Sequence, residues 1–151
     1  MLVAFDLDEC LIATREAHER AFAAVGVQPP GGENRYKPAR YWLHSQEAHD
    51  AKHVLFPEYA LKWSHMLPAC RFARPGDYIL TGTSERSFKV IAELYPHLKQ
   101  MRPVAFGMGP DDKLDWMCRQ SAGIYFDDWT EMVKRVREEV LHWQAIDVSE
   151  F

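Results

Sequence analysis

Short apolar runs alternate along the chain with longer segments whose apolar residues recur every three or four positions. The runs have the length of buried strands and cover residues 2–5, 78–80, 103–106 and 123–126, with an edge strand expected at 144–148. Helical spacing covers residues 14–25, 85–95, 112–120 and 130–140. This alternation predicts an α/β fold in which a Rossmann-like parallel sheet is flanked by helices.

Capping residues mark the expected ends of these helices. Thr14, Ser84 and Thr130 are each placed to cap a helix N-terminus with a side-chain oxygen. Gly26 is placed to end the first helix.

A segment between the first and second strands interrupts the alternation. A loop rich in Pro and Gly at 28–34 is followed by two expected helices, 46–54 and 58–67, with Trp63, Met66 and Leu67 turned toward a core. We therefore predict a core made of residues 1–14 and 73–151 and a small, mainly helical insertion at 15–72.

The insertion places basic and aromatic residues side by side. Arg35, Lys37 and Arg40 alternate with aromatic residues, namely Tyr36, Tyr41 and Trp42. Such a set can hold an anion and stack on a base, which suits a nucleotide or a nucleic-acid end. Equally, the aromatic rings can pack the insertion while the cations stay in water.

The overall composition, the histidines and the cysteines restrict the possible function only slightly. A chain of 151 residues that is 47% hydrophobic suits one domain, and a net charge of −4 gives no general case for nucleic-acid binding. His44, His49 and His53 lack Cys or carboxylate partners, so a water-facing helix surface is expected instead of a zinc site. Three scattered cysteines indicate free thiols in a reducing cytoplasm, and the N-terminal apolar run is too short for a signal peptide or membrane span.

Carboxylates follow the first and fourth predicted strands. If strands one, two and four are neighbours, their carboxyl ends bring together Asp6, Asp8, Thr81, Asp127 and Asp128. Clustered carboxylates repel unless a cation compensates, and hard oxygen ligands without a His or Cys cluster favour Mg²⁺. Taken alone, Asp6 and Asp8 also fit a solvated turn.

Lys113 lies in the first turn of a predicted helix, at the wrong end of the helix dipole. Either Asp111 and Asp112 offset its charge, or it holds an anionic oxygen at the helix N-terminus. Thr81 can donate its hydroxyl to the same oxygens or simply end a strand.

Four of these stretches resemble, in order and context, the motifs of the haloacid dehalogenase-like (HAD) superfamily. They are Phe5-Asp6-Leu7-Asp8, Ile79-Leu80-Thr81, Lys113 and Tyr125-Phe126-Asp127-Asp128. The resemblance implies a Mg²⁺-dependent phosphomonoester hydrolase with a helical cap over the site. Asp6 would be the nucleophile that forms an aspartyl-phosphate, and Asp8 the general acid and base.

The remaining roles follow from the same resemblance. Asp127 would complete a metal site that also uses Asp6 and the backbone carbonyl of Asp8, and Asp128 would either bind the metal through a water molecule or orient the groups that bind it. Thr81, Gly82 and Lys113 would bind the phosphoryl oxygens. The implied partner is a small phosphorylated substrate or a nucleic-acid end, as for 5′(3′)-nucleotidases or 3′-phosphatases.

Two positions depart from the family pattern. Glu9 and Cys10 stand where a small residue and Thr are usual. Glu9 adds a carboxylate that either weakens substrate binding or points away, and Cys10 is expected to be a packed thiol. The alternative function is a non-catalytic binding or regulatory protein that keeps the HAD fold.

Overall fold

The computed structural model describes residues 1–31, 42 and 44–151. Its centre is a five-stranded parallel sheet in the order β5 (Arg102–Pro103), β4 (Tyr78–Ile79), β1 (Leu2–Phe5), β6 (Gly123–Asp127) and β7 (Trp143–Asp147). The N-terminal strand therefore lies in the middle, between the second and fourth strands expected from the sequence. This confirms the α/β class and the strand adjacency on which the carboxylate site depends.

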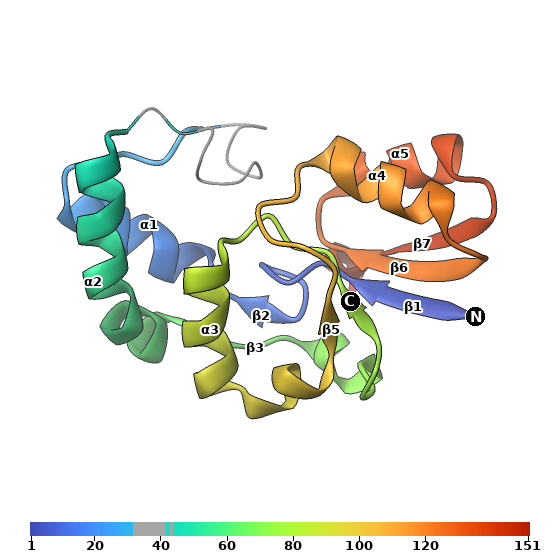
Figure 1. Ribbon diagram of the computed structural model, residues 1–151, viewed down its shortest axis with the longest axis horizontal. Helices are drawn as coiled ribbons and strands as arrows, with labels where there is room; N and C mark the ends of the chain where they lie inside the picture. Colours follow the sequence, from blue (N-terminus) through green and yellow to red (C-terminus); the bar gives the residue numbers. More distant parts are fainter. Residues whose placement is uncertain (32–41, 43) are drawn as a thin grey trace.

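Helices cover both faces of the sheet (Figure 1). On one face α4 (Pro110–Arg119) and α5 (Thr130–Glu139) pack through Met117, Val133 and Val136 onto Ala4 and Tyr125. On the other face α3 (Glu85–Leu94) and the 3₁₀ turn η4 (Pro96–Gln100) pack onto Phe5, Ile79 and Phe126. Successive strand residues point to opposite faces of the sheet. Because helices cover both faces, both sets of side chains in β1 and β6 are buried, and these strands read as continuous apolar runs in the sequence.

Register fixes where the polar residues emerge. Phe5 is paired with Phe126 on one side and with Ile79 on the other. Asp6 and Asp127 each follow one of these paired residues, and the Asp6 N–H donates to the Phe126 carbonyl at 2.9 Å. The two carboxylates therefore lie level at the carboxyl edge of the sheet, where ligands bind in open α/β folds.

The stretch between β1 and β4 contributes two helices beside the sheet (Figure 1). They are α1 (Arg15–Ala24) and α2 (Gln46–Trp63), which pack on each other. A small antiparallel pair, β2 (Ile12–Ala13) with β3 (His65–Met66), and the turn η3 (Pro68–Phe72) join them to the core. A further 3₁₀ turn, η5 (Val148–Glu150), ends the described chain. The cap boundary at 15–72 stays a prediction.

The second half of the insertion differs from the expectation. One helix runs through Pro57 instead of two helices broken near it, because Lys52, Phe56 and Ala60 bury one continuous face on both sides of the proline. That burial offsets the backbone hydrogen bond that a proline removes. The helix ends at Trp63, and Met66 enters β3 with its side chain 55% exposed, so its predicted core position is wrong.

The helix ends follow the sequence in part. Ser84 caps α3 as expected, with its hydroxyl accepting from the Ser87 N–H, and Gly26 follows α1 with a positive φ of 83°. Thr14 occupies the cap position of α1 but its hydroxyl donates to Asp8 instead. Thr130 is not a cap, since Trp129 holds that position and the Thr130 hydroxyl donates to Asp147 at 2.8 Å.

Two further observations complete the fold. The third core strand is limited to Arg102–Pro103, shorter than the 103–106 expected, and only the Val104 N–H extends its ladder by donating to the Ile79 carbonyl. Among the described helices, not one combines the length and the apolar character that a membrane crossing requires.

Candidate active site

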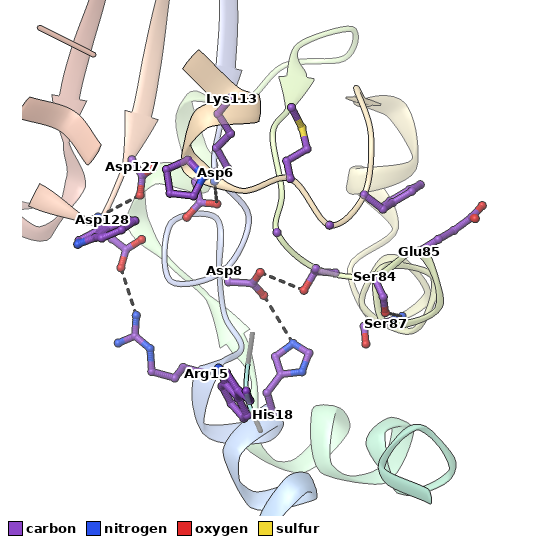
Figure 2. Close-up of a pocket in the computed structure, with 18 of the residues that line it drawn as sticks. Asp6, Asp8, Arg15, His18, Ser84, Glu85, Ser87, Lys113, Asp127 and Asp128 are labelled. Carbon is purple, nitrogen blue, oxygen red and sulfur yellow. Dashed lines mark hydrogen bonds and ion pairs between the residues drawn. The ribbon is translucent and has the colours of Figure 1, made fainter. Parts of the chain in front are cut away.

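A cavity of about 440 Å³ opens between the carboxyl edge of the sheet and helices α1 and α2. Two groups of residues face each other across it (Figure 2). We call the first the core wall, and it consists of Asp6, Asp8, Lys113, Asp127 and Asp128. We call the second the cap wall, and it consists of Arg15, His18, His49, Lys52 and His53.

Asp6 lies at the centre of the core wall. The Lys113 ammonium donates to Asp6 Oδ1 at 2.9 Å, and both side chains are nearly buried. Lys113 reaches this point because α4 begins directly above the sheet edge, so the cation predicted at the wrong end of a helix dipole contacts an anionic oxygen. Asp112 instead accepts from the Gly109 N–H at 2.8 Å, and Asp111 pairs with Arg135.

Three carboxylates crowd this point. Asp6, Asp127 and Asp128 each offer an oxygen, and these oxygens all lie within 4.8 Å of one another. Burial raises the pKa of Asp6, and the negative charges of Asp127 and Asp8 add to that effect while Lys113 opposes it. Burial likewise raises the pKa of Asp128, with Asp6 and Asp127 adding and Arg15, 3.5 Å away, opposing.

This crowding fits a divalent cation. Among the described residues, Lys113 and Arg15 are the two cations in ion pairs with these three carboxylates, and burial together with the neighbouring carboxylates raises the pKa of Asp6 and of Asp128 in spite of them. Three hard oxygen donors in this spacing suit Mg²⁺, which takes one or two carboxylates and completes its shell with water and substrate oxygens. The residues present therefore fit the metal that the sequence predicts.

Asp127 is held from both sides. Its Oδ1 accepts from the Trp129 N–H at 3.0 Å, and its Oδ2 accepts from the Tyr125 hydroxyl. Trp129 therefore contributes to holding Asp127 through its backbone N–H.

Asp8 lies apart from the three carboxylates and faces the cap (Figure 2). Its Oδ2 accepts from the Thr83 hydroxyl at 3.0 Å and its Oδ1 from the Thr14 hydroxyl, while His18 Nε2 lies 3.7 Å from Oδ1. Although burial acts to raise it, His18 and the two hydroxyls lower the pKa of Asp8 to about 2. Asp8 is therefore ionised in this conformation.

Lys52 is the main surprise of the cap wall. Its side chain is 2% exposed, its ammonium lies 2.9 Å from His18 Nδ1, and it stands over the rings of Phe22 and Phe56. Within the described residues it makes no ion pair with a carboxylate. Burial lowers the pKa of Lys52 to about 7, with the charge of Arg86 adding and Asp8 opposing.

The histidines of α2 do not form the water-facing surface that the sequence predicted. His53 is buried, and its Nε2 lies 2.9 Å from His49 Nε2, both on the cavity side of the helix. The reason is that α2 packs this face against α1 and α3, which the helical spacing alone does not reveal. Burial lowers the pKa of His53 to about 3, so the ring is neutral. The described residues contain no cluster of three His, Cys or carboxylate ligands other than that around Asp6.

The two departures from the family pattern have structural explanations. Glu9 has a φ of 61° and turns its carboxylate to the Arg15 N–H, at 2.7 Å, so it accepts from the first turn of α1 and does not line the cavity. Cys10 is fully buried, and its thiol lies 3.5 Å from the Phe126 carbonyl. Cys10, Cys70 and Cys118 are all free thiols.

The predicted site residues are distributed unevenly. The cavity is lined by Asp6, Asp8, Gly82, Lys113, Asp127 and Asp128. Thr81 is fully buried and is not among the lining residues, and its hydroxyl oxygen accepts from the Thr83 N–H at 3.0 Å. Arg35, Lys37 and Arg40 lie outside the described residues.

Sequence reasoning missed the polar residues that surround Asp8. Thr14 was interpreted only as a cap, while His18, Lys52 and Thr83 received no role. A signal for one of them existed, since His18 falls on the same helical face as the apolar Ala17, Ala21 and Phe22, and a polar residue on a buried face is a candidate for function.

Comparison with known proteins places this geometry in a fold. Neither protein-family models nor curated proteins match the sequence. Among solved structures, CbbY from Rhodobacter sphaeroides in complex with phosphate is 18% identical with a TM-score of 0.63, covering 97% of this chain and 85% of that one. A second CbbY structure, a mutant, holds xylulose-(1,5)-bisphosphate, with 19% identity, a TM-score of 0.63 and the same coverage.

A third similar structure is a protein assigned as a phosphoglycolate phosphatase from Lactobacillus plantarum. It is 10% identical, with a TM-score of 0.61, and the match covers 95% of this chain and 84% of that one. At these identities the likeness establishes the architecture alone. The chain has the haloacid dehalogenase-like fold.

Proposed function

We propose that the chain is a Mg²⁺-dependent phosphomonoester hydrolase that acts through an aspartyl-phosphate on Asp6. The observation that carries this proposal is the core wall itself: a buried Asp6 carboxylate with Lys113 at 2.9 Å and two further carboxylates within 4.8 Å, open to a cavity. A site built only for binding gains nothing from gathering buried carboxylates, which are costly to ionise together.

Asp6, Asp127 and Asp128 would hold Mg²⁺ through their side chains, with the backbone carbonyl of Asp8 as a further donor. Bound there, Mg²⁺ would withdraw charge from the phosphoryl oxygens during transfer. Trp129 and Tyr125 keep the Asp127 carboxylate in place by donating to its two oxygens.

The first chemical step belongs to Asp6. Its carboxylate oxygen attacks phosphorus, and the bond from phosphorus to the leaving oxygen breaks as the new bond forms. Asp8 gives its proton to the leaving oxygen, so that an alcohol departs. Lys113 stays beside Asp6 and balances the negative charge on the phosphoryl oxygens.

The second step returns Asp6 to its starting state. Asp8, now a carboxylate, takes a proton from water, which attacks phosphorus and breaks the bond to Asp6, releasing inorganic phosphate. The ionised Asp8 of this structure, with donors from Thr14 and Thr83, matches the base form that this step needs. For the first step it must gain a proton, which the approach of a phosphate dianion favours.

The cap wall supports a small substrate with polar groups beyond its phosphate. Lys52 is buried at the cavity with its amino group 2.9 Å from His18 Nδ1, so an anionic or accepting group on the leaving side of the substrate would stabilise its charge. Nucleotides and sugar phosphates both meet this requirement. The two CbbY structures hold phosphate and xylulose-(1,5)-bisphosphate, which adds sugar bisphosphates to the candidates. A nucleic-acid end rests on Arg35, Lys37 and Arg40, outside the described residues.

The test is Mg²⁺-dependent phosphate release from sugar mono- and bisphosphates, nucleoside 5′- and 3′-monophosphates and 3′-phosphorylated oligonucleotides. Asp6→Asn should reduce release about 10⁴-fold or more while the protein stays folded. Asp111→Asn, a change to an exposed carboxylate of α4, is the matched control and should leave release unchanged. No release by folded wild-type protein from any substrate would instead favour the non-catalytic binding protein.

A further inference from the structure

Tyr125 carries a hydroxyl that lies between Asp127, a proposed metal ligand, and Lys113, the proposed phosphate-binding lysine. It lies on β6 two residues before Asp127, so both side chains point to the same face of the sheet. Its side chain is fully buried in the cluster formed with α4 and α5. A phenylalanine would fill that apolar space equally well, and burying the extra hydroxyl costs free energy unless it is hydrogen-bonded.

The direction of its hydrogen bonds is fixed by chemistry. A phenol has one proton to donate and lone pairs to accept with, whereas a carboxylate only accepts and an ammonium only donates. The Tyr125 hydroxyl therefore donates to Asp127 Oδ2 and accepts from Lys113 Nζ, 3.5 Å away. Lys113 in turn donates to Asp6 at 2.9 Å. Lys113 thus donates directly to Asp6, and it is connected to Asp127 through the hydroxyl of Tyr125.

This arrangement leaves Asp127 little freedom. One of its oxygens accepts from Tyr125 and the other from the Trp129 N–H. The backbone contact alone would leave the carboxylate able to rotate about its Cβ–Cγ bond, and the second donor removes that rotation. Groups that orient a metal ligand in this way typically change metal affinity about 10- to 100-fold when they are lost.

We propose that Tyr125 is a positioning residue that orients Asp127 for the divalent metal and couples that ligand to Lys113. The proposal rests on the metal role of Asp127 in the proposed function. The proposal assigns two roles to the Tyr125 side chain: its hydroxyl orients Asp127, and its ring packs against α4 and α5.

The experiment is Mg²⁺ titration by calorimetry of wild-type protein and Tyr125→Phe, without substrate. The variant should bind Mg²⁺ about 10-fold more weakly, at the lower end of the range for lost orienting groups. The matched control is Tyr95→Phe, which also loses one hydroxyl partner, Ser64 at 2.8 Å, but lies away from the cavity. Its Mg²⁺ affinity should equal that of the wild type.

The outcomes are distinct. If Tyr125→Phe folds and binds Mg²⁺ with wild-type affinity, or if it does not fold, the hydroxyl is structural and the proposal is overturned. Equal weakening in Tyr95→Phe also overturns it, because the effect would then be unspecific. If the wild type binds no Mg²⁺ at all, the metal role in the proposed function fails first, and this proposal falls with it. Weakening confined to Tyr125→Phe supports it even where no substrate has been found.

Discussion

The two walls of the cavity are built by different means. Each carboxylate of the core wall follows a strand end, so the sheet register alone brings Asp6 level with Asp127. The cap wall is assembled from the inner faces of two helices, and its position depends on how α1 and α2 pack. The core wall is rich in negative charge held by close donors, and the cap wall supplies the opposite sign through Arg15 and Lys52. Topology thus places the residues of the proposed chemistry, and helix packing places the groups that we propose contact the substrate.

The strongest test of the core wall is Lys113→Met. Removing the ammonium leaves Asp6, Asp127 and Asp128 with Arg15, paired with Asp128, as the remaining cation that the described residues place in an ion pair with them, and phosphate release should fall about a hundred- to a thousand-fold. Without Mg²⁺ the variant should also lose about 3–5 kcal/mol of unfolding free energy, since a buried charge has lost its partner. Chemical denaturation with and without Mg²⁺ measures this, and Mg²⁺ should restore part of the loss.

The control for that experiment is Lys134→Met, which changes an exposed lysine of α5. Its release rate and stability should match the wild type. Wild-type turnover by Lys113→Met would contradict the proposed role of Lys113 in binding the phosphoryl oxygens beside Asp6.

Lys52→Met tests the cap wall in the same way. If Lys52 meets the leaving side of the substrate, KM should rise about 10- to 100-fold with a smaller change in kcat, as expected for a lost binding contact to a charged group. Stability should be unchanged or higher, because an apolar chain of similar length replaces an ammonium that is buried between Phe22 and Phe56. The matched control is Lys62→Met, an exposed lysine at the end of the same helix. A fall in kcat with unchanged KM would contradict a role of Lys52 in substrate binding and would indicate that it acts on the chemical step, through its contact with His18 beside Asp8.

The same contrast explains what the sequence could predict. That Asp6, Asp8, Asp127 and Lys113 lie together could be predicted because the residues that end a strand or begin a helix are visible in the order of apolar and polar positions. Lys52 and His53 were missed because α2 shows no clean apolar stripe: a lysine and a histidine take buried positions beside Phe56 and Ala60. Pro57 then suggested a break that tertiary packing overrides. Thr81 was placed at the phosphate from its position after a strand, and its hydrogen bond to the Thr83 N–H could not be anticipated.

The pH dependence of stability gives a test of Lys52 that needs no substrate. Its pKa is lowered from 10.5 to about 7 in the folded protein, so between these values the unfolded chain binds a proton that the folded chain does not. Stability should therefore rise with pH across this window. Relative to Lys52→Met, the wild type should gain about 2 kcal/mol between pH 7 and pH 9, measured by denaturant unfolding at each pH. If the unfolding free energies of the two proteins changed with pH in the same way, Lys52 would be charged in the folded state in spite of its burial, and the lowered pKa would be contradicted.

The smallest effect is expected where the two walls join. Glu9 holds a positive φ of 61°, a conformation that favours glycine, yet its carboxylate accepts from the Arg15 N–H at the start of α1. Glu9→Gly should relieve backbone strain of about 1 kcal/mol and lose a hydrogen bond of about the same size, leaving unfolding free energy nearly unchanged. Glu9→Gln keeps an acceptor and the strain, so it should also be close to wild type. Phosphate release should stay within about 3-fold in both, since this carboxylate does not line the cavity. A large rise in activity with Glu9→Gly would instead mean that Glu9 repels the substrate, and that the joint between core and cap takes part in selecting it.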